Sequence, residues 1–271
     1  MIRLQAPCMK ALLRLVCMST IVLSCNESTL DHPEFERYFR QYSVEGSFVL
    51  YDLQNDAYTY YNLERCKKQF IPASTFKILN SLVALETGVV QDENTVLPWD
   101  GVRRAPAAWN QDQDMKAAIK NSTVWFYQEL ARRIGTKRMQ QYVSQARYGN
   151  MNIAGGIDMF WLTGQLRISQ MEQVQFLVRL YKEDLPFTRH NMEMVKKILV
   201  QEETPVYTLR AKTGWGEQEG KNIGWYVGYI EREGNAYFFA TNIESENPDE
   251  SLFPGARTAI SRQILQNLGL L

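Results

Sequence analysis

The chain has 271 residues, of which 45% are hydrophobic and 22% are charged, with equal numbers of basic and acidic residues. This composition excludes a disordered or membrane-embedded chain and is typical of a soluble protein with one domain or two closely packed ones. No run of basic residues follows the first 25 positions, so nucleic acid is not expected as a partner.

The first 25 residues have the composition of a targeting segment. Three basic residues accompany an apolar stretch over residues 12–25, which is too short and too interrupted to span a membrane stably. Translation can start at Met1 or at Met9, and the second start gives a more regular signal. We predict that residues 1–25 are a signal peptide and that the mature chain, residues 26–271, is periplasmic.

The end of this segment leaves two modes of processing open. Its last four residues, Val-Leu-Ser-Cys, resemble a bacterial lipobox, in which Cys25 would be lipidated and would become the mature N-terminus. The alternative is ordinary signal cleavage near the same place. Contact with a membrane is therefore expected only through a lipid on Cys25.

Few side chains after the targeting segment can serve as a thiol nucleophile, a histidine base or a metal ligand. Cys66 is the only cysteine there, so no internal disulfide is expected, and His32 and His190 are the only histidines. The sequence has no Gly-x-Ser-x-Gly motif, no His-Glu-x-x-His motif and no pair of cysteines spaced for a metal. We therefore expect no metal, and we expect a lysine to be the base for any catalytic serine.

The hydrophobic pattern, taken in chain order, places strands near both ends and helices between them. Alternation predicts strands over residues 46–53, 57–61, 206–211, 223–230 and 236–243. Helical spacing predicts helices over residues 76–87, 111–120, 121–134, 136–147, 169–181 and 187–199, with a last helix from Pro254 to Leu268. Gly88 is expected to end the first helix, Thr136 to cap the fourth and a capping box at Ser169 to begin the fifth.

This order predicts an α/β fold of the layered α+β kind. An antiparallel sheet is expected from the two chain ends, residues 26–72 and 204–271, flanked by terminal helices. A mainly helical insert is expected over residues 73–203. We predict that the two parts form a single domain, with a site in the cleft between the sheet and the insert.

Ser74 and Lys77 lie where the predicted sheet part joins the first helix. At the N-terminus of a helix, Ser74 would be near free N–H groups that favour developing negative charge. Lys77 would be one turn further on the same face, where burial could lower its pKa enough for it to take the serine proton. A Ser-x-x-Lys pattern is expected about once by chance in such a chain, so a capping serine with a solvated lysine is the alternative.

Two further motifs carry groups suited to the same chemistry. Ser122 begins a predicted helix and is either a proton relay or an N-cap. Lys212, Thr213 and Gly214 end a predicted strand, where a cation, a hydroxyl and a glycine suit a substrate carboxylate; an ordinary surface strand end is the alternative. Ser-x-x-Lys together with Lys-Thr-Gly is a signature of serine β-lactamases and penicillin-binding proteins.

Taken together, these motifs resemble those of the class D β-lactamases, the oxacillinases. The match covers nearly the whole mature chain in the family's order, and two of its segments are far more specific than Ser-x-x-Lys. Its segments are Ser74-Thr75-Phe76-Lys77, Ser122-Thr123-Val124, Tyr148-Gly149-Asn150, Phe160-Trp161-Leu162 and Lys212-Thr213-Gly214-Trp215. The second segment lacks the Ser-Asp-Asn of class A, which favours class D.

The resemblance implies a β-lactamase/transpeptidase-like fold and hydrolysis of β-lactam antibiotics through a serine acyl-enzyme, and hence antibiotic resistance. Ser74 would be the nucleophile. Lys77 would be N6-carboxylysine, formed with CO₂ or bicarbonate, and would be the base for both acylation and deacylation. The Trp161 indole N–H would donate to the carbamate. No other cofactor is implied.

The resemblance also implies roles for the remaining motif residues. Ser122 would pass a proton to the leaving nitrogen, and the backbone N–H groups of Ser74 and Trp215 would form the oxyanion hole. The substrate carboxylate would bind Lys212, Thr213 and Arg257, beside Gly214. The pocket walls and their support would come from Phe76, Val124, Trp161, Leu162, Tyr148 and Asn150. A helix-surface arginine remains the alternative for Arg257.

Two related functions remain open. A penicillin-binding sensor domain or a D,D-peptidase shares the serine and lysine motifs but is acylated without turnover. A sensor needs transmembrane segments upstream, and Trp161, as support for a second-step base, favours hydrolysis. We expect β-lactam small molecules as partners and a chain that is a monomer or a homodimer.

Overall fold

The structure is a computed structural model and describes residues 1–2, 28–249 and 251–271. The predicted signal peptide, the alternative start at Met9 and the lipobox at Cys25 lie outside these residues, apart from the first two positions. In the described part of the chain, no helix combines the length and the apolar character needed to cross a membrane.

A mixed sheet of seven strands is the central layer of the described residues. The strands are β1 (Ser28–Asp31), β2 (Glu45–Asp52), β3 (Ala57–Tyr61), β4 (Val200–Glu203), β5 (Tyr207–Gln218), β6 (Lys221–Arg232) and β7 (Asn235–Ser245). Their order in the sheet is β1-β3-β2-β7-β6-β5-β4, so the two ends of the chain meet where β2 pairs with β7. Both predicted hairpins are confirmed, as β2–β3 and β6–β7.

The first strand corrects the prediction of a purely antiparallel sheet. β1 pairs with β3 in parallel, whereas the other neighbouring strands described are antiparallel. After β1 the chain reverses through the 3₁₀ turn η1 (Pro33–Phe35) and helix α1 (Glu36–Arg40), and the β2–β3 hairpin reverses it again. β1 and β3 therefore run in the same direction, a pairing that no short-range pattern in the sequence encodes.

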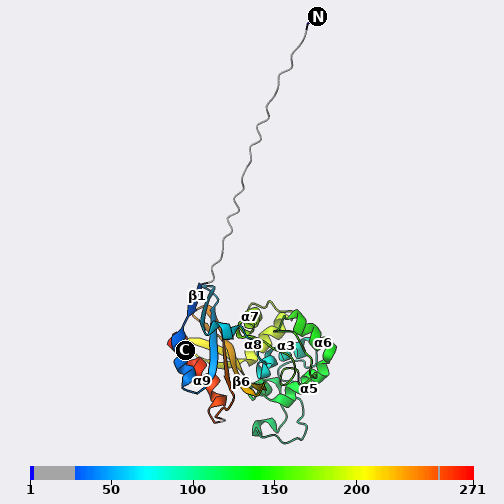
Figure 1. The fold of residues 1–271 in the computed structure, drawn as a ribbon. Coiled ribbons are helices and arrows are strands. Elements are labelled where there is room, and N and C mark those ends of the chain that lie inside the picture. Colours follow the sequence, from blue (N-terminus) through cyan, green and yellow to red (C-terminus); the bar gives the residue numbers. More distant parts are fainter. Residues whose placement is uncertain (3–27, 250) are drawn as a thin grey trace.

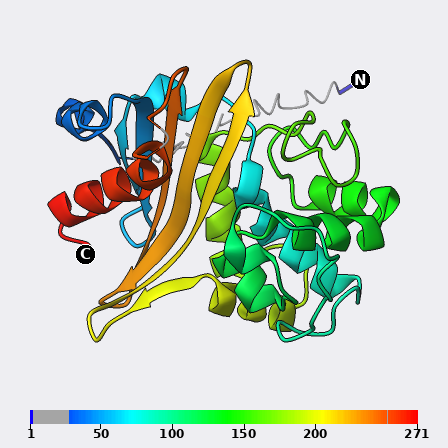
Figure 2. The same ribbon diagram turned by 90° about the horizontal axis from the view of Figure 1, so that it is seen from below.

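Helices cover both faces of this sheet (Figures 1 and 2). One face packs against α1 and the C-terminal helix α9 (Phe253–Asn267), and the other face packs against the helical insert. Neighbouring residues of β2 point to opposite faces, so Phe48 belongs to the core under α9 and Val49 to the core under the insert. β6 is buried without interruption from Ile223 to Ile230, as expected for a strand covered on both faces.

The insert consists of short helices at most of the predicted positions. The helical elements from the first hairpin to β4 are α2 (Leu63–Cys66), η2 (Ala73–Phe76), α3 (Lys77–Glu86), η3 (Ala107–Trp109), α4 (Met115–Lys120), α5 (Val124–Ile134), α6 (Thr136–Gln145), α7 (Gln170–Tyr181) and α8 (Arg189–Ile198). The capping box at Ser169 is confirmed at the start of α7. Strands β1 and β4 and helices α1 and α2 were not predicted, because each is too short to show a period.

Several predicted helix starts differ from the observed ones. The helices expected from residues 121 and 187 begin at Val124 and Arg189, so Ser122 lies in the turn before α5, with φ +54°. The helix expected from residue 111 begins at Met115, because Gln113 first forms a bridge with Leu97. Asp114 then caps α4 by accepting a hydrogen bond from the backbone N–H of Ala117 (2.7 Å). Thr136 is the first residue of α6 and not its cap; Gly135, with φ +78°, separates α5 from α6.

Candidate active site

Ser74 and Lys77 are both buried at the junction of η2 and α3. Lys77 Nζ donates a hydrogen bond to Ser74 Oγ over 2.7 Å. Burial lowers the pKa of Lys77 well below its usual 10.5, and the charge of Lys212 lowers it further. Neither η2 nor α3 has a side-chain cap, so the alternative of a capping serine and a solvated lysine is wrong.

An aromatic wall encloses Lys77. Phe76 is fully buried; its ring stacks on Trp161 with centroids 5.3 Å apart and meets Phe160 edge-on at 4.9 Å. Lys77 Nζ lies 5.4 Å from the centroid of the Tyr127 ring. Lys77 is itself fully buried, and this loss of contact with water is the main physical cause of its lowered pKa.

Trp161 carries an unpaired polar atom in this wall. Its side chain is fully buried, and Nε1 has no hydrogen-bond partner among the described residues. A buried donor without an acceptor costs about 1–3 kcal/mol. This donor therefore fits an additional buried acceptor, such as a carboxylate on Lys77, whose neighbour Phe76 stacks on Trp161.

Ser122 and Lys212 form a second pair. Lys212 Nζ donates to Ser122 Oγ over 3.0 Å and to the Thr213 carbonyl over 3.1 Å. Burial, with a contribution from Arg257, lowers the pKa of Lys212 to about 7. Thr123 holds the N-cap position of α5 without a side-chain cap bond, so the N-cap interpretation of Ser122 is wrong.

Glycine allows strand β5 to approach the turn that carries Ser74. A Cβ on Gly214 would lie 3.0 Å from the Pro72 carbonyl oxygen and 3.1 Å from Thr75 Cγ2. These distances are shorter than about nine in ten real contacts of a Cβ, so with a larger residue β5 and η2 would have to move apart by a few tenths of an ångström. The glycine of Lys-Thr-Gly therefore brings the backbone of Trp215 close to Ser74.

These elements surround a cavity of about 200 Å³. It is lined by Ser74, Trp109, Ser122, Val124, Thr213, Gly214, Trp215 and Arg257. Arg257 reaches it from α9; burial lowers the pKa of its guanidinium to about 10, and its Nε and Nη1 have no hydrogen-bond partner in the described part of the chain. Lys212 does not line the cavity but bonds to Ser122 and Thr213, which do, so its charge and that of Arg257 make one side of the cavity suitable for an anion.

Of the remaining predicted residues, Trp215 lines this cavity, whereas Phe76 and Leu162 do not. Trp215 is 41% exposed, and its indole N–H donates to Asn222 Oδ1 (2.9 Å). Leu162 is half-buried, and its carbonyl faces Gly216. The distance from the Leu162 carbonyl oxygen to a Cβ added on Gly216 would be 3.9 Å. Phe76 lies behind Lys77 in the aromatic wall.

Tyr148 and Asn150 lie behind the site. Tyr148 is fully buried and meets the Phe76 ring edge-on at 5.7 Å. Asn150 is exposed; its side-chain amide donates to the Gln165 carbonyl (2.8 Å) and accepts from the Arg167 N–H (3.0 Å). Asn150 thus closes the base of the loop that carries Trp161.

Trp109 is a cavity residue to which sequence reasoning assigned no role. Its indole N–H donates to the Asn121 carbonyl (2.9 Å), and its own carbonyl accepts from the indole N–H of Trp125 (2.8 Å). Its place in a loop with two prolines and one glycine, residues 96–109, was the only signal in the sequence.

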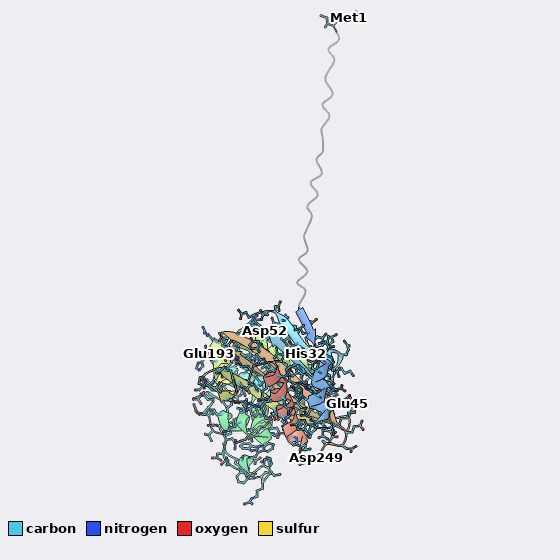
Figure 3. All side chains as sticks on the ribbon, turned by 90° about the vertical axis from the view of Figure 1, so that its left-hand side faces the viewer. Met1, His32, Glu45, Asp52, Glu193 and Asp249 are labelled. Carbon is cyan, nitrogen blue, oxygen red and sulfur yellow. The ribbon has the colours of Figure 1, made fainter. Side chains whose placement is uncertain are left out.

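The two histidines lie elsewhere. His32 contacts Glu34 and stacks on Phe35, on the sheet side of the molecule (Figure 3). His190 is exposed in the first turn of α8. Neither lines the cavity.

A buried serine–lysine pair, a serine–lysine relay and an anion site between a sheet and a helical insert define a serine enzyme of the penicillin-recognising class. In agreement, the family model "Penicillin binding protein transpeptidase domain" matches residues 43–266. The fold is therefore of the transpeptidase/β-lactamase type, as predicted.

Individual relatives narrow this class. Beta-lactamase OXA-5 of Pseudomonas aeruginosa is 42% identical over 264 residues, which cover 96% of this chain and 97% of the relative. Beta-lactamase OXA-48 of Klebsiella pneumoniae is 39% identical over 87% of this chain and 88% of the relative. The crystal structure of the class D β-lactamase YbXI from Nostoc has a TM-score of 0.84 and 46% identity, over 89% of this chain and all of that chain. The chain belongs to the class D β-lactamases and is a hydrolase, as the motifs indicated.

Proposed function

We propose that this chain hydrolyses β-lactam antibiotics through an acyl-enzyme on Ser74, with carboxylated Lys77 as the general base of both half-reactions. The observation that carries this proposal is the environment of Lys77. Its Nζ is fully buried and lies 2.7 Å from Ser74 Oγ, and the ring of the preceding residue, Phe76, stacks on Trp161, whose indole N–H has no partner among the described residues. Burial favours the neutral amine, which is the form that adds CO₂.

The residues around Lys77 suit this modification. A carbamate there would supply a carboxylate base beside the serine hydroxyl, and Trp161 Nε1 would hold it by a hydrogen bond. The donor would then be satisfied, and a hydrogen bond to a charged group contributes about 1.5–3 kcal/mol.

Acylation would use Ser74 and Ser122. Ser74 Oγ attacks the lactam carbonyl carbon while its proton leaves toward the Lys77 side chain, and the carbon–nitrogen bond of the ring opens. Ser122, hydrogen-bonded to Lys212, delivers a proton to the leaving nitrogen. The backbone N–H groups of Ser74 and Trp215 stabilise the oxyanion, where the loss of one donor costs on the order of 10²–10³ in rate.

Binding would use the cationic side of the cavity. The substrate carboxylate would accept hydrogen bonds from Thr213 and from Arg257, with the charge of Lys212 nearby. Val124 and Trp109 line the same cavity and would contact the apolar parts of the substrate. In the second half-reaction a water gives a proton to the Lys77 side chain and attacks the acyl carbonyl carbon; the bond to Ser74 Oγ breaks, and Ser74 Oγ takes the proton back from Lys77.

Two measurements test this proposal. We expect a chromogenic cephalosporin to be turned over continuously by the purified protein, faster when bicarbonate is added. We also expect ¹³C NMR of protein equilibrated with ¹³C-bicarbonate to give a carbamate signal that Lys77→Ala lacks. A single stoichiometric burst, unchanged by bicarbonate, would instead support the sensor or D,D-peptidase alternative.

We also propose that residues 1–25 export the protein to the periplasm. This rests on the basic start and the short apolar stretch of the leader. Cell fractionation of a Gram-negative host that expresses the full chain tests it, with activity expected in the periplasmic or membrane fraction. Cys25→Ala would move membrane-bound activity into the soluble periplasm if Cys25 is lipidated, and would change nothing if cleavage is ordinary.

A further inference from the structure

The segment that leads to Ser74 is hydrogen-bonded at several residues to the start of α7 and to the residue just before it. Phe70 and Ile168 exchange two backbone hydrogen bonds, of 2.9 and 2.8 Å, just before α7 begins. The Gln69 amide donates to both carboxylate oxygens of Glu172 in the first turn of α7 (2.9 and 3.0 Å). α7 therefore follows the chain from residue 69 up to the turn η2.

A further hydrogen bond from α7 is made to Thr75, the residue next to Ser74. Gln173 is fully buried, and its Nε2 donates to Thr75 Oγ1 over 2.7 Å. The Thr75 hydroxyl in turn donates to the Pro72 carbonyl over 2.8 Å. Gln173 Oε1 accepts from the Tyr148 hydroxyl over 3.5 Å. A side chain of α7 is thus bonded to the middle of the turn that carries Ser74.

The turn needs such support. η2 is a 3₁₀ turn, whose hydrogen bonds are less favourable than those of an α-helix. Ala73 begins it with φ +47°, a conformation that a residue with a Cβ adopts only when the surrounding structure holds it there. The hydrogen bond from the Thr75 hydroxyl to the Pro72 carbonyl spans this strained residue. The hydrogen bond from Gln173 holds the Thr75 hydroxyl in place.

We propose that Gln173 is a positioning residue that holds Ser74 for attack through Thr75. This inference rests on the proposed role of Ser74 as the nucleophile. Gln173 does not line the cavity, so its effect is on the placement of Ser74 Oγ and the Ser74 N–H and not on contacts to the substrate. A displacement of about 1 Å at a reacting atom can cost on the order of 100-fold in rate.

Gln170 offers a matched control on the same helix. It is also fully buried, and its Nε2 donates to the carbonyls of Ser47 (2.9 Å) and Ala240 (2.7 Å). The Ser47 hydroxyl donates to its Oε1. These bonds attach α7 to strands β2 and β7 and do not reach η2, so loss of the Gln170 amide perturbs the fold without acting directly on Ser74.

The experiment compares Gln173→Met with Gln170→Met, since methionine keeps the volume and removes the amide. Single-turnover kinetics with a chromogenic cephalosporin separate the acylation rate from the dissociation constant of the initial complex. We expect Gln173→Met to acylate about 10- to 100-fold more slowly with the dissociation constant unchanged. We expect Gln170→Met to lower the melting temperature and to leave both constants near those of the wild type.

A second variant removes the same hydrogen bond from the other side. Thr75→Val should slow acylation to a similar degree, and Thr75→Val combined with Gln173→Met should be no slower than the slower single variant. If Gln173→Met does not fold, Thr75→Val alone carries the test, against Gln170→Met.

Two results would overturn the inference. The first is that Gln173→Met acylates as fast as the wild type. If only Thr75→Val folds, the same result for Thr75→Val overturns the inference. The other is an equal slowing in Gln170→Met, which would mean that general destabilisation is the cause. Mass spectrometry of the wild type separates this failure from failure of the proposed function: without a β-lactam adduct on Ser74, both ideas are wrong.

Discussion

Replacing Trp161 by phenylalanine would remove the indole N–H while keeping an aromatic ring against Phe76. In the wild type the two rings stack with centroids 5.3 Å apart, and the indole nitrogen has no other partner among the described residues. If that N–H holds a carbamate on Lys77, its loss removes a hydrogen bond to a charged group, which contributes about 1.5–3 kcal/mol. The carbamate equilibrium should weaken by about 10- to 150-fold, since about 1.4 kcal/mol corresponds to a factor of ten.

The stability of the Trp161→Phe variant should change little. The unpaired donor that costs about 1–3 kcal/mol in the uncarboxylated protein is removed. The smaller ring leaves a cavity whose cost, about 24 cal/mol per Å³, is of comparable size. A melting temperature within a few degrees of the wild type would show that any loss of activity is not a loss of fold.

The assay follows turnover and the carbamate separately. Turnover of a chromogenic cephalosporin by Trp161→Phe should fall at ambient CO₂, with accumulation of acyl-enzyme, and should recover in part as bicarbonate is raised. The ¹³C carbamate signal should need a correspondingly higher bicarbonate concentration to saturate. Lys77→Ala is the control and should respond to bicarbonate in neither assay. Normal deacylation by Trp161→Phe without added bicarbonate would refute the assigned role of the indole N–H.

Four further predictions follow from the same site. Lys77→Ala should lower the turnover number by at least about 10³-fold in steady-state kinetics, because a positioned base contributes roughly 10²–10⁴ to each half-reaction; retention of full activity would contradict the base assignment. The pKa of Lys212 is lowered to about 7, so this lysine loses its charge as pH rises through that value. KM for carboxylate-bearing substrates should therefore increase from pH 6 to 9, and Lys212→Arg should flatten this profile. A flat profile in the wild type would exclude the lysine as an anion ligand. The same lowered pKa means that the unfolded state binds more protons, so the stability contribution of Lys212 should rise with pH between about 7 and 10.5, as chemical denaturation of wild type and Lys212→Met can measure. Gly214→Ala places a Cβ 3.0 Å from the Pro72 carbonyl oxygen. The value of kcat/KM should fall at least about tenfold, and the free energy of unfolding should drop by about 1–3 kcal/mol. Unchanged kinetics would mean that β5 need not approach η2 so closely.

Much of the fold could be predicted because its longer elements carry their own periodicity. The two hairpins, α7 with its capping box and the C-terminal helix all appear where alternation, helical spacing and turn residues put them. β5 was expected over residues 206–211 but extends to Gln218, so Lys212, Thr213 and Gly214 lie inside the strand and not at its end. The parallel pairing of β1 was missed, since pairing between strands far apart in the chain depends on contacts that no local pattern describes. The late start of α4 has a similar cause: a bridge from Gln113 to Leu97 overrides local helical preference.

The sequence by itself determined the order of the motifs, and through their order the family of the chain. It could not decide whether Ser74 and Ser122 are helix caps or reactive groups, because both uses require the same residue type at a helix start. Only the tertiary structure excludes the caps, by leaving both serines outside the cap positions and placing a lysine against each of them, which is the ground on which we propose that they react. The lowered pKa of Lys77 was likewise decided only there: it comes from rings contributed by distant segments, which desolvate the amine, and desolvation is a property of the folded surroundings.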